Sequence, residues 1–200
     1  MPKQKNRLAP APSYPDLVNL GYASQISRLQ TVVRLVQSGF GTASSWDNEV
    51  DSTSRGWLVY LRQLQFTLQR HRGVDRRVVF TEVKIDTPVA DAWQRVFSAA
   101  GLAREGTVAG GAEGGTLDLV TADGDRLRGR VEVWNPPKDL VMIIAGWNDA
   151  HLWVEIGPAP RAKMAKLTLS LYGVEPATAD AIERRWLALL PRVFADVART

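Results

Sequence analysis

The chain has 200 residues, no cysteine and two histidines, with 45% hydrophobic and 23% charged residues and a formal net charge of +4. This composition is typical of a globular protein with one sizeable core or two small ones. The lack of cysteine excludes disulfides, thiolate metal sites and a cysteine nucleophile. No apolar run is long enough to span a membrane, and none follows the polar N-terminus as in a signal peptide, so we expect a cytoplasmic protein.

The positive charge is scattered along the chain rather than gathered in one stripe. The densest basic stretch lies between residues 70 and 77, and elsewhere basic residues alternate with acids. A nucleic-acid surface would cluster its lysines and arginines and interleave them with aromatic residues. We therefore expect neither nucleic acid nor a membrane as a partner.

In the first 73 residues, the sequence predicts a disordered segment, one strand and then one amphipathic helix. Residues 1–27 are polar and rich in proline, which favours disorder. The β-branched segment Thr31–Gln37 predicts a strand. A helix is expected from about Thr53 to His71, with Gly73 just beyond its end. Its apolar residues recur every three or four positions and form one stripe, made of Trp57, Leu61, Leu64 and Leu68.

Residues 78–198 predict a second, larger unit of the α+β class. A strand over 78–85 precedes a short helix that starts near Pro88 and turns Trp93 and Phe97 inward. A glycine-rich loop over 109–115 leads into alternating segments that predict an antiparallel meander, over 116–120, 127–134, 140–147, 152–156 and 165–172. Leu127, Val131 and Val133 are expected to face the core. A last helix runs from about Thr178 to Ala198.

Two motifs in this unit resemble a known family. The segment 82–93, Glu-Val-Lys-Ile-Asp-Thr-Pro-Val-Ala-Asp-Ala-Trp, is similar to the first strand and helix entry of homologues of the activator of heat-shock-protein-90 ATPase. The segment 129–137, Gly-Arg-Val-Glu-Val-Trp-Asn-Pro-Pro, resembles their mid-sheet turn. This branch belongs to the START-like, or SRPBCC, superfamily. The resemblance implies a helix-grip fold, in which a curved antiparallel sheet of six or seven strands wraps around a long C-terminal helix.

An internal repeat links the two parts of the chain. The segment from Val32 to Leu68 resembles the one from Lys166 to Val197, because each has a strand, a glycine and then a tryptophan-led helix. This suggests that residues 28–73 are the C-terminal remnant of a first START-like domain; an unrelated helical extension is the alternative. A lone strand and helix cannot bury both apolar faces, so we expect them to pack on the larger unit, to pair in a homodimer or to stay partly disordered.

The polar residues give weak signals of catalysis. His71 falls at a helix end, and His151 begins a strand without a nucleophile-elbow motif, so a hydrogen-bonded strand histidine is the preferred interpretation. Asp123 and Asp125 flank Gly124, where aspartate is typical of a tight turn. We expect no catalytic residue, no metal and no cofactor.

The tryptophans of the second unit carry more information. They would either fill the core or line a cavity between the sheet and the last helix, as in relatives that hold apolar molecules. The resemblance favours non-enzymatic binding of a small apolar ligand; a co-chaperone-like protein-interaction module and a cyclase- or dehydratase-like enzyme are the alternatives. The predicted lining consists of Trp93, Phe97, Met142, Ile144, Trp147, Trp153, Leu171, Trp186 and Leu190.

Overall fold

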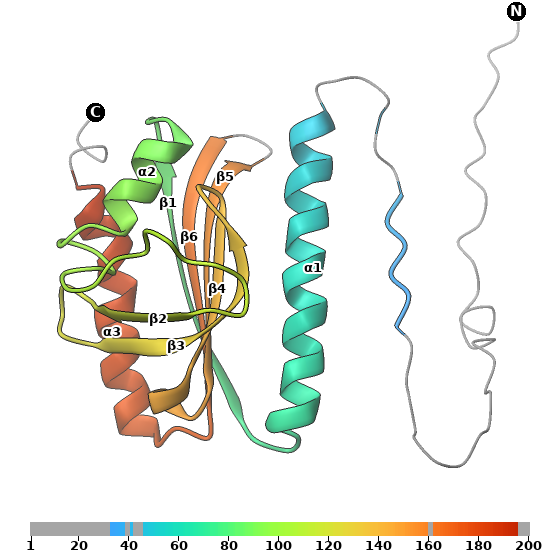
Figure 1. Ribbon diagram of the computed structural model, residues 1–200. Helices are drawn as coiled ribbons and strands as arrows, with labels where there is room; N and C mark the ends of the chain where they lie inside the picture. The colour runs from blue at the N-terminus through green and yellow to red at the C-terminus, as the bar shows by residue number, and fades with distance from the viewer. Residues whose placement is uncertain (1–32, 39–40, 42–45, 160–161, 196–200) are drawn as a thin grey trace, which may run out of the picture. The chain divides into compact units, whose positions relative to one another are not determined.

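A computed structural model describes residues 33–38, 41, 46–159 and 162–195 of the chain. The chain divides into two units, residues 1–39 and residues 40–200, and every helix and strand described lies in the second (Figure 1). Residues 33–38 belong to no helix or strand, so the strand predicted over Thr31–Gln37 is not formed in its described part. The disorder predicted for residues 1–27 concerns residues outside the described ranges.

The second unit contains a long first helix, then a short helix among six strands, and a last helix. The helices are α1 (Asp47–Arg70), α2 (Val89–Val96) and α3 (Pro176–Val193), and a short 3-10 turn η3 covers Ala145–Trp147. The strands are β1 (Arg76–Ile85), β2 (Thr116–Val120), β3 (Arg126–Asn135), β4 (Asp139–Ile144), β5 (Ala150–Ala159) and β6 (Ala162–Tyr172).

The six strands form one antiparallel sheet in the order β1-β6-β5-β4-β3-β2. All neighbours in the meander from β2 to β6 follow one another in sequence, and β1 closes the far edge against β6. The last helix, α3, packs on one face of the sheet and buries Ile182, Trp186, Leu189 and Leu190 there. A meander that holds a C-terminal helix in this way is the helix-grip fold, so the predicted fold class is confirmed.

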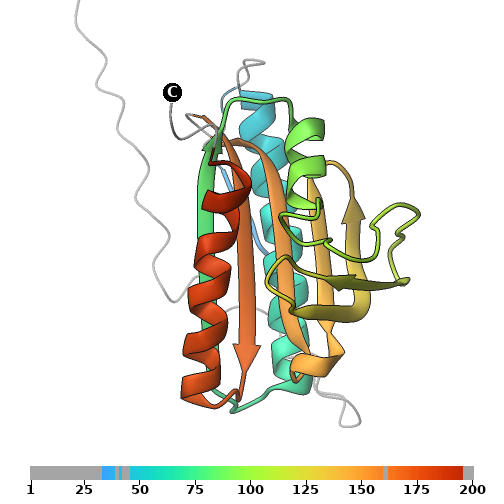
Figure 2. The ribbon, with the colours of Figure 1, turned by 90° about the vertical axis from the view of Figure 1, so that its left-hand side faces the viewer.

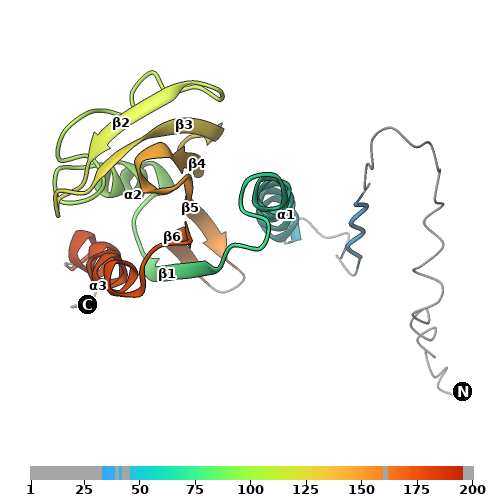
Figure 3. The same cartoon turned by 90° about the horizontal axis from the view of Figure 1, so that it is seen from below.

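Both faces of the sheet are covered. Helices α2 and α3 lie on one face and α1 on the other, as the two turned views show (Figures 2 and 3). We call the face covered by α2 and α3 the inner face and the face covered by α1 the outer face. All six residues of β4 are buried for this reason: Leu140, Met142 and Ile144 join the inner core, while Val141 lies in a small outer cluster. An apolar run without alternation is expected of a strand covered on both sides.

Strand β3 changes face in the middle. Its register against β4 shifts between Val131 and Val133, so Val131 joins the inner core and Val133 the outer cluster. The prediction that Val133 faces the same core as Val131 is therefore wrong, because a bulge breaks the two-residue period. Gly129 also pairs with β4, and a Cβ atom there would lie 1.8 Å from the carbonyl oxygen of Ile143. Only glycine allows this approach of the two strands.

Helix α1 starts six residues before the predicted Thr53 and ends as predicted, with Gly73 at a φ of 76° beyond its C-cap His71. It buries Val59 and Gln63 against the outer face of the sheet. The predicted stripe of Trp57, Leu61, Leu64 and Leu68 is not the side of α1 that packs on the sheet. Within the described residues, no helix is both long and apolar enough to cross a bilayer.

Candidate functional site

The structure distributes the nine predicted lining residues over three places. Trp153 lies on the outer face with Val59 of α1, so its predicted position between sheet and last helix is wrong; one residue of register decides the face. Trp147 lies on η3, partly buried, with its ring 6.0 Å from that of Trp186. The other seven belong to one packed inner core, and each is at most 9% exposed: Trp93, Phe97, Met142, Ile144, Leu171, Trp186 and Leu190.

The centre of the inner core is filled by side chains. Trp186 of α3 is 1% exposed, and its indole nitrogen donates a 3.1 Å hydrogen bond to Asp125 in the β2–β3 turn. Arg185 and Arg192 bind Asp125 and Asp123 in the same turn at 2.7 and 2.8 Å. The two aspartates of the predicted tight turn thus hold the sheet to α3. Trp186 fills the space between the sheet and the helix.

A groove of about 300 Å³ opens beside α2. Its aromatic wall comes from Trp93 and Phe97, with ring centroids 4.6 Å apart, and from Trp134 of β3, whose ring lies edge-on to Trp93 at 6.1 Å. The opposite wall is the loop after α2, with Val108 and Ala109. Two of the predicted lining residues, Trp93 and Phe97, thus border a groove, although it lies at the end of α2 rather than between the sheet and α3.

A second groove of about 540 Å³ lies where the end of α2 meets the end of α3. It is larger, but it has no aromatic ring in its lining, and four of its six lining residues have polar side chains, among them Arg95, Ser98 and Arg192. Arg192 is held by Asp123, and the Arg95 guanidinium lies 6.0 Å from the Phe194 ring centre. Its lining chemistry suits an apolar ligand less well than the three aromatic rings of the first groove do.

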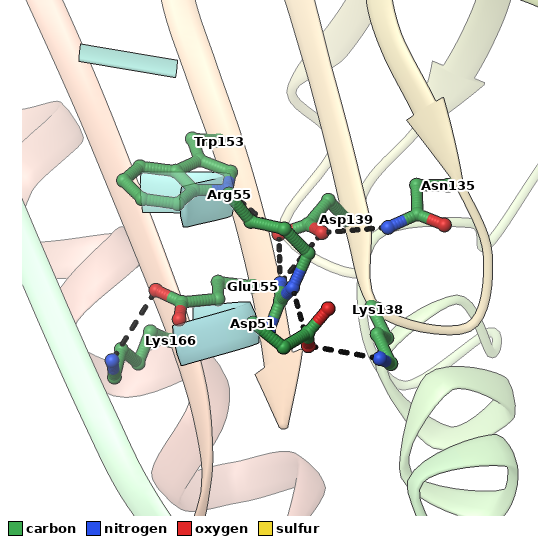
Figure 4. Close-up of polar contacts among 8 residues, drawn as sticks. All are labelled: Asp51, Arg55, Asn135, Lys138, Asp139, Trp153, Glu155 and Lys166. Atoms are coloured by element: carbon green, nitrogen blue, oxygen red, sulfur yellow. Dashed lines mark hydrogen bonds and ion pairs between the residues drawn. The ribbon is translucent and has the colours of Figure 1, made fainter. Parts of the chain in front are cut away.

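A buried ion pair fastens α1 to the outer face (Figure 4). The Nη1 atom of Arg55 donates to both carboxylate oxygens of Asp139, at 2.8 and 2.6 Å, and the two side chains are only 12% and 2% exposed. Asn135 and the indole of Trp153 donate to the same carboxylate. Burial lowers the pKa of Arg55, but the carboxylates of Asp139 and Asp51 more than offset this and leave that pKa raised.

A second polar cluster lies further along α1. Gln63 is 4% exposed; its amide nitrogen donates to Ser170 Oγ at 2.7 Å and lies 3.4 Å from His151 Nδ1. Arg76 of β1 also donates to Ser170. Burial, together with the positive charge of Arg76, lowers the pKa of His151 to about 4.

These contacts argue against a catalytic His151. Ser170 Oγ accepts hydrogen bonds from Gln63 and Arg76, which withdraw electron density from the oxygen instead of activating it as a nucleophile. The side-chain contact of the imidazole is with Gln63, whose amide nitrogen lies 3.4 Å from Nδ1. The interpretation of His151 as a hydrogen-bonded strand residue is therefore confirmed. Within the described residues, no group of three or more His, Asp or Glu side chains is placed to hold a metal ion.

No family model matches the sequence, and no curated protein matches it. The chain is similar to several solved structures. An AHSA1-like protein from Aeromonas hydrophila is 16% identical, with 62% of this chain and 93% of that chain covered and a TM-score of 0.44. Protein MLL2253 from Mesorhizobium loti is also 16% identical, with 62% and 98% covered and a TM-score of 0.43. Norcoclaurine synthase from Thalictrum flavum is 12% identical, with 84% and 98% covered and a TM-score of 0.40.

Similarities at this level say nothing of activity. The element order and the sheet topology of the protein itself confirm, at the level of fold, the resemblance recognised in its sequence. The chain has a helix-grip fold.

Proposed function

We propose that the protein binds a small apolar ligand, without catalysis, in the groove beside α2. The observation that carries this proposal is the convergence of three aromatic side chains, Trp93, Phe97 and Trp134, on one groove of about 300 Å³. Ligand sites are commonly concave, mostly apolar and of this size or larger. Flat aromatic walls favour a flat, apolar molecule, because stacked and edge-on ring contacts add to the burial of surface.

The wall opposite the aromatic rings supports the same proposal. It is formed by the glycine-rich loop after α2, in which Gly106, Gly110 and Gly114 adopt positive φ angles. Gly111 lies against the ring of Trp134, where a Cβ atom would approach to 2.6 Å. The loop therefore lies directly on one of the aromatic rings, and a shift of the loop changes the width of the groove.

A substitution in this loop tests the proposal. Ala109 is exposed and lines the groove, whereas Ala112 is exposed and does not. Ala109→Glu places a charged side chain at the groove, and burying a carboxylate beside an apolar ligand is costly. We expect at least a tenfold weaker affinity of this variant for 2-naphthol, measured by quenching of tryptophan fluorescence. The matched Ala112→Glu variant should bind as the wild type does.

Native mass spectrometry of the protein purified gently from its host would show whether a natural ligand is retained. We expect a non-covalent apolar mass on the wild type and on Ala112→Glu, and its loss from Ala109→Glu. Equal retention by both variants would show that the ligand binds elsewhere, and the groove would then be the wrong site.

A second candidate function, that of a protein-interaction module, is favoured by a different observation. The side of α1 that faces away from the sheet carries exposed apolar residues, among them Leu64 at 45% and Leu68 at 58% exposure. Exposed apolar patches of this kind mark contact surfaces in many soluble proteins.

A further inference from the structure

Helix α1 is amphipathic in the reverse sense to most surface helices. The side chains that contact the sheet are largely charged or polar: Arg55 binds Asp139, Arg62 donates to the carbonyl oxygen of Glu132, and Gln63 binds Ser170. At 100° per residue, the opposite side is apolar. We call this side the outer stripe, and it consists of Val50, Trp57, Leu61, Leu64 and Leu68. A surface helix ordinarily turns its apolar stripe to the core and its charges to water.

The outer stripe is substantially open to solvent. Val50 and Trp57 are each 39% exposed, and Leu64 and Leu68 are more so. The exposed apolar surface continues beside the helix onto the edge strand β1, where Val78 and Phe80 are 44% and 49% exposed. Val78 pairs with Ser170, the residue that Gln63 of α1 binds, so this part of β1 adjoins the helix.

The spacing of the outer stripe is that of a helix that packs along another helix. From Trp57 the stripe advances by four, three and four residues, and Val50 lies seven residues before Trp57. This is the alternation of the a and d positions in a heptad repeat. In α3 the same tryptophan-led spacing begins at Trp186 and Leu190, and there it is buried against the sheet. The pattern on α1 is therefore suited to cover an apolar surface that the described part of the chain does not place on it.

The charges around the outer stripe favour a second copy as the partner. The positions beside it, from Thr53 through Leu58, Tyr60 and Gln65 to Thr67, are uncharged, so two copies meet there without repulsion between like charges. The helix has acidic residues in its first turn, Asp47 and Glu49; at its other end Arg70 pairs with Asp149 of the same chain, and the basic residue Arg72 follows the helix. In an antiparallel pair, each acidic end lies beside the basic end of the other copy, and the two helix dipoles oppose one another favourably.

We infer that two copies of this chain form a homodimer, with the outer stripes of their α1 helices packed antiparallel about a twofold axis. A twofold interface uses the same patch on both subunits, and a self-complementary stripe with oppositely charged ends meets this requirement. The inference is independent of the ligand groove, which lies on the inner side of the sheet beside α2.

The experiment measures the mass of the full chain in solution by sedimentation velocity and light scattering between about 1 and 100 µM. The wild type should have twice the chain mass of 22.1 kDa. Leu64→Glu places one carboxylate from each copy, two in all, within the proposed interface, and this variant should be a monomer. Leu64 is 45% exposed in a single chain, so the substitution should disturb the fold of each copy little. Gln69→Glu adds the same charge to an exposed position of α1 that lies outside the outer stripe, about 100° around the helix from Leu68, and this variant should remain a dimer.

Thermal unfolding followed by circular dichroism checks that Leu64→Glu is folded; Leu68→Glu serves as a second variant of the outer stripe if it is not. A wild type that stays monomeric at 100 µM overturns the inference, and the outer stripe is then covered by other residues of the same chain or by a different protein. A dimer that persists in both Leu64→Glu and Leu68→Glu also overturns it, because the copies then meet through another surface.

Discussion

Replacing Arg55 by methionine should lower the free energy of unfolding by about 3 to 5 kcal/mol, the cost typical of removing one member of a buried ion pair. Asp139 is 2% exposed, and its carboxylate would lose the cation that balances it. Asn135 and Trp153 still donate to Asp139, but neutral donors do not replace a guanidinium. Methionine preserves the apolar stem of Arg55, so the loss reports on the charge rather than on packing. Urea unfolding at pH 7 measures the change.

Two further variants show how much of the change in the free energy of unfolding comes from the buried ion pair. Arg70→Ala breaks the pair with Asp149, whose side chains are 62% and 26% exposed, and should cost at most about 1 kcal/mol. The double variant Arg55→Met with Asp139→Asn removes both charges, and it should be more stable than Arg55→Met alone because no unbalanced carboxylate remains. If Arg55→Met costs no more than Arg70→Ala, α1 is not held to the sheet by this pair.

The inner half of the fold follows from local patterns in the sequence. Alternation predicts β2 with the bounds it has and β3 to within one residue at each end, although the bulge of β3 breaks the alternation after Val131. Strand β4 was expected to continue to Trp147, but it ends at Ile144 and the chain enters η3, with Asn148 and Asp149 at positive φ. A continuous apolar run carries no period, so its end cannot be read from alternation.

The candidate sites were harder to predict because they depend on which face of an element is covered. The apolar stripe of α1 suggested that this side of the helix packs on the sheet, which is wrong. A hydrophobic pattern shows which residues avoid water, but it does not show that the polar side of a helix has buried partners. Asp51 and Arg55, four residues apart, gave the one local sign of a polar contact face. Their long-range partners, Asp139 and Lys138, lie more than 80 residues away and have no signal in the sequence.

His151 provides a pH-dependent test of how α1 is held. Burial and the charge of Arg76 lower its pKa to about 4, against 6.5 for an exposed imidazole. Between these values the unfolded chain binds a proton that the folded protein does not, so stability is full above pH 6.5 and falls as the pH drops toward 4. The whole difference corresponds to about 3 kcal/mol, of which about 2 kcal/mol should be lost between pH 6.5 and pH 5.

A His151→Asn variant should lack most of this loss, because asparagine does not titrate. Comparing urea unfolding of the two proteins at pH 6.5 and pH 5 isolates the imidazole from the carboxylates, which titrate mainly at lower pH. Proton NMR of the imidazole gives the pKa directly, and the variant assigns the signal, since the chain has only one other histidine. An imidazole of His151 that titrates near 6.5 would show that water reaches it beneath α1.

The location of His151 determines which part of the protein should open first when the pH is lowered. Its covering groups on the outer face are Gln63, 3.4 Å from Nδ1, and the ring of Phe66, at 6.5 Å between centroids, and both belong to α1. A protonated imidazole gains hydration when α1 moves away, whereas the inner core gains nothing from the same movement. We therefore expect amide hydrogen exchange in α1 to accelerate between pH 6.5 and pH 5, after correction for the intrinsic rate, while exchange in β5 and β6 stays slow. Equal acceleration in all three elements would mean that α1 and the sheet open as one unit.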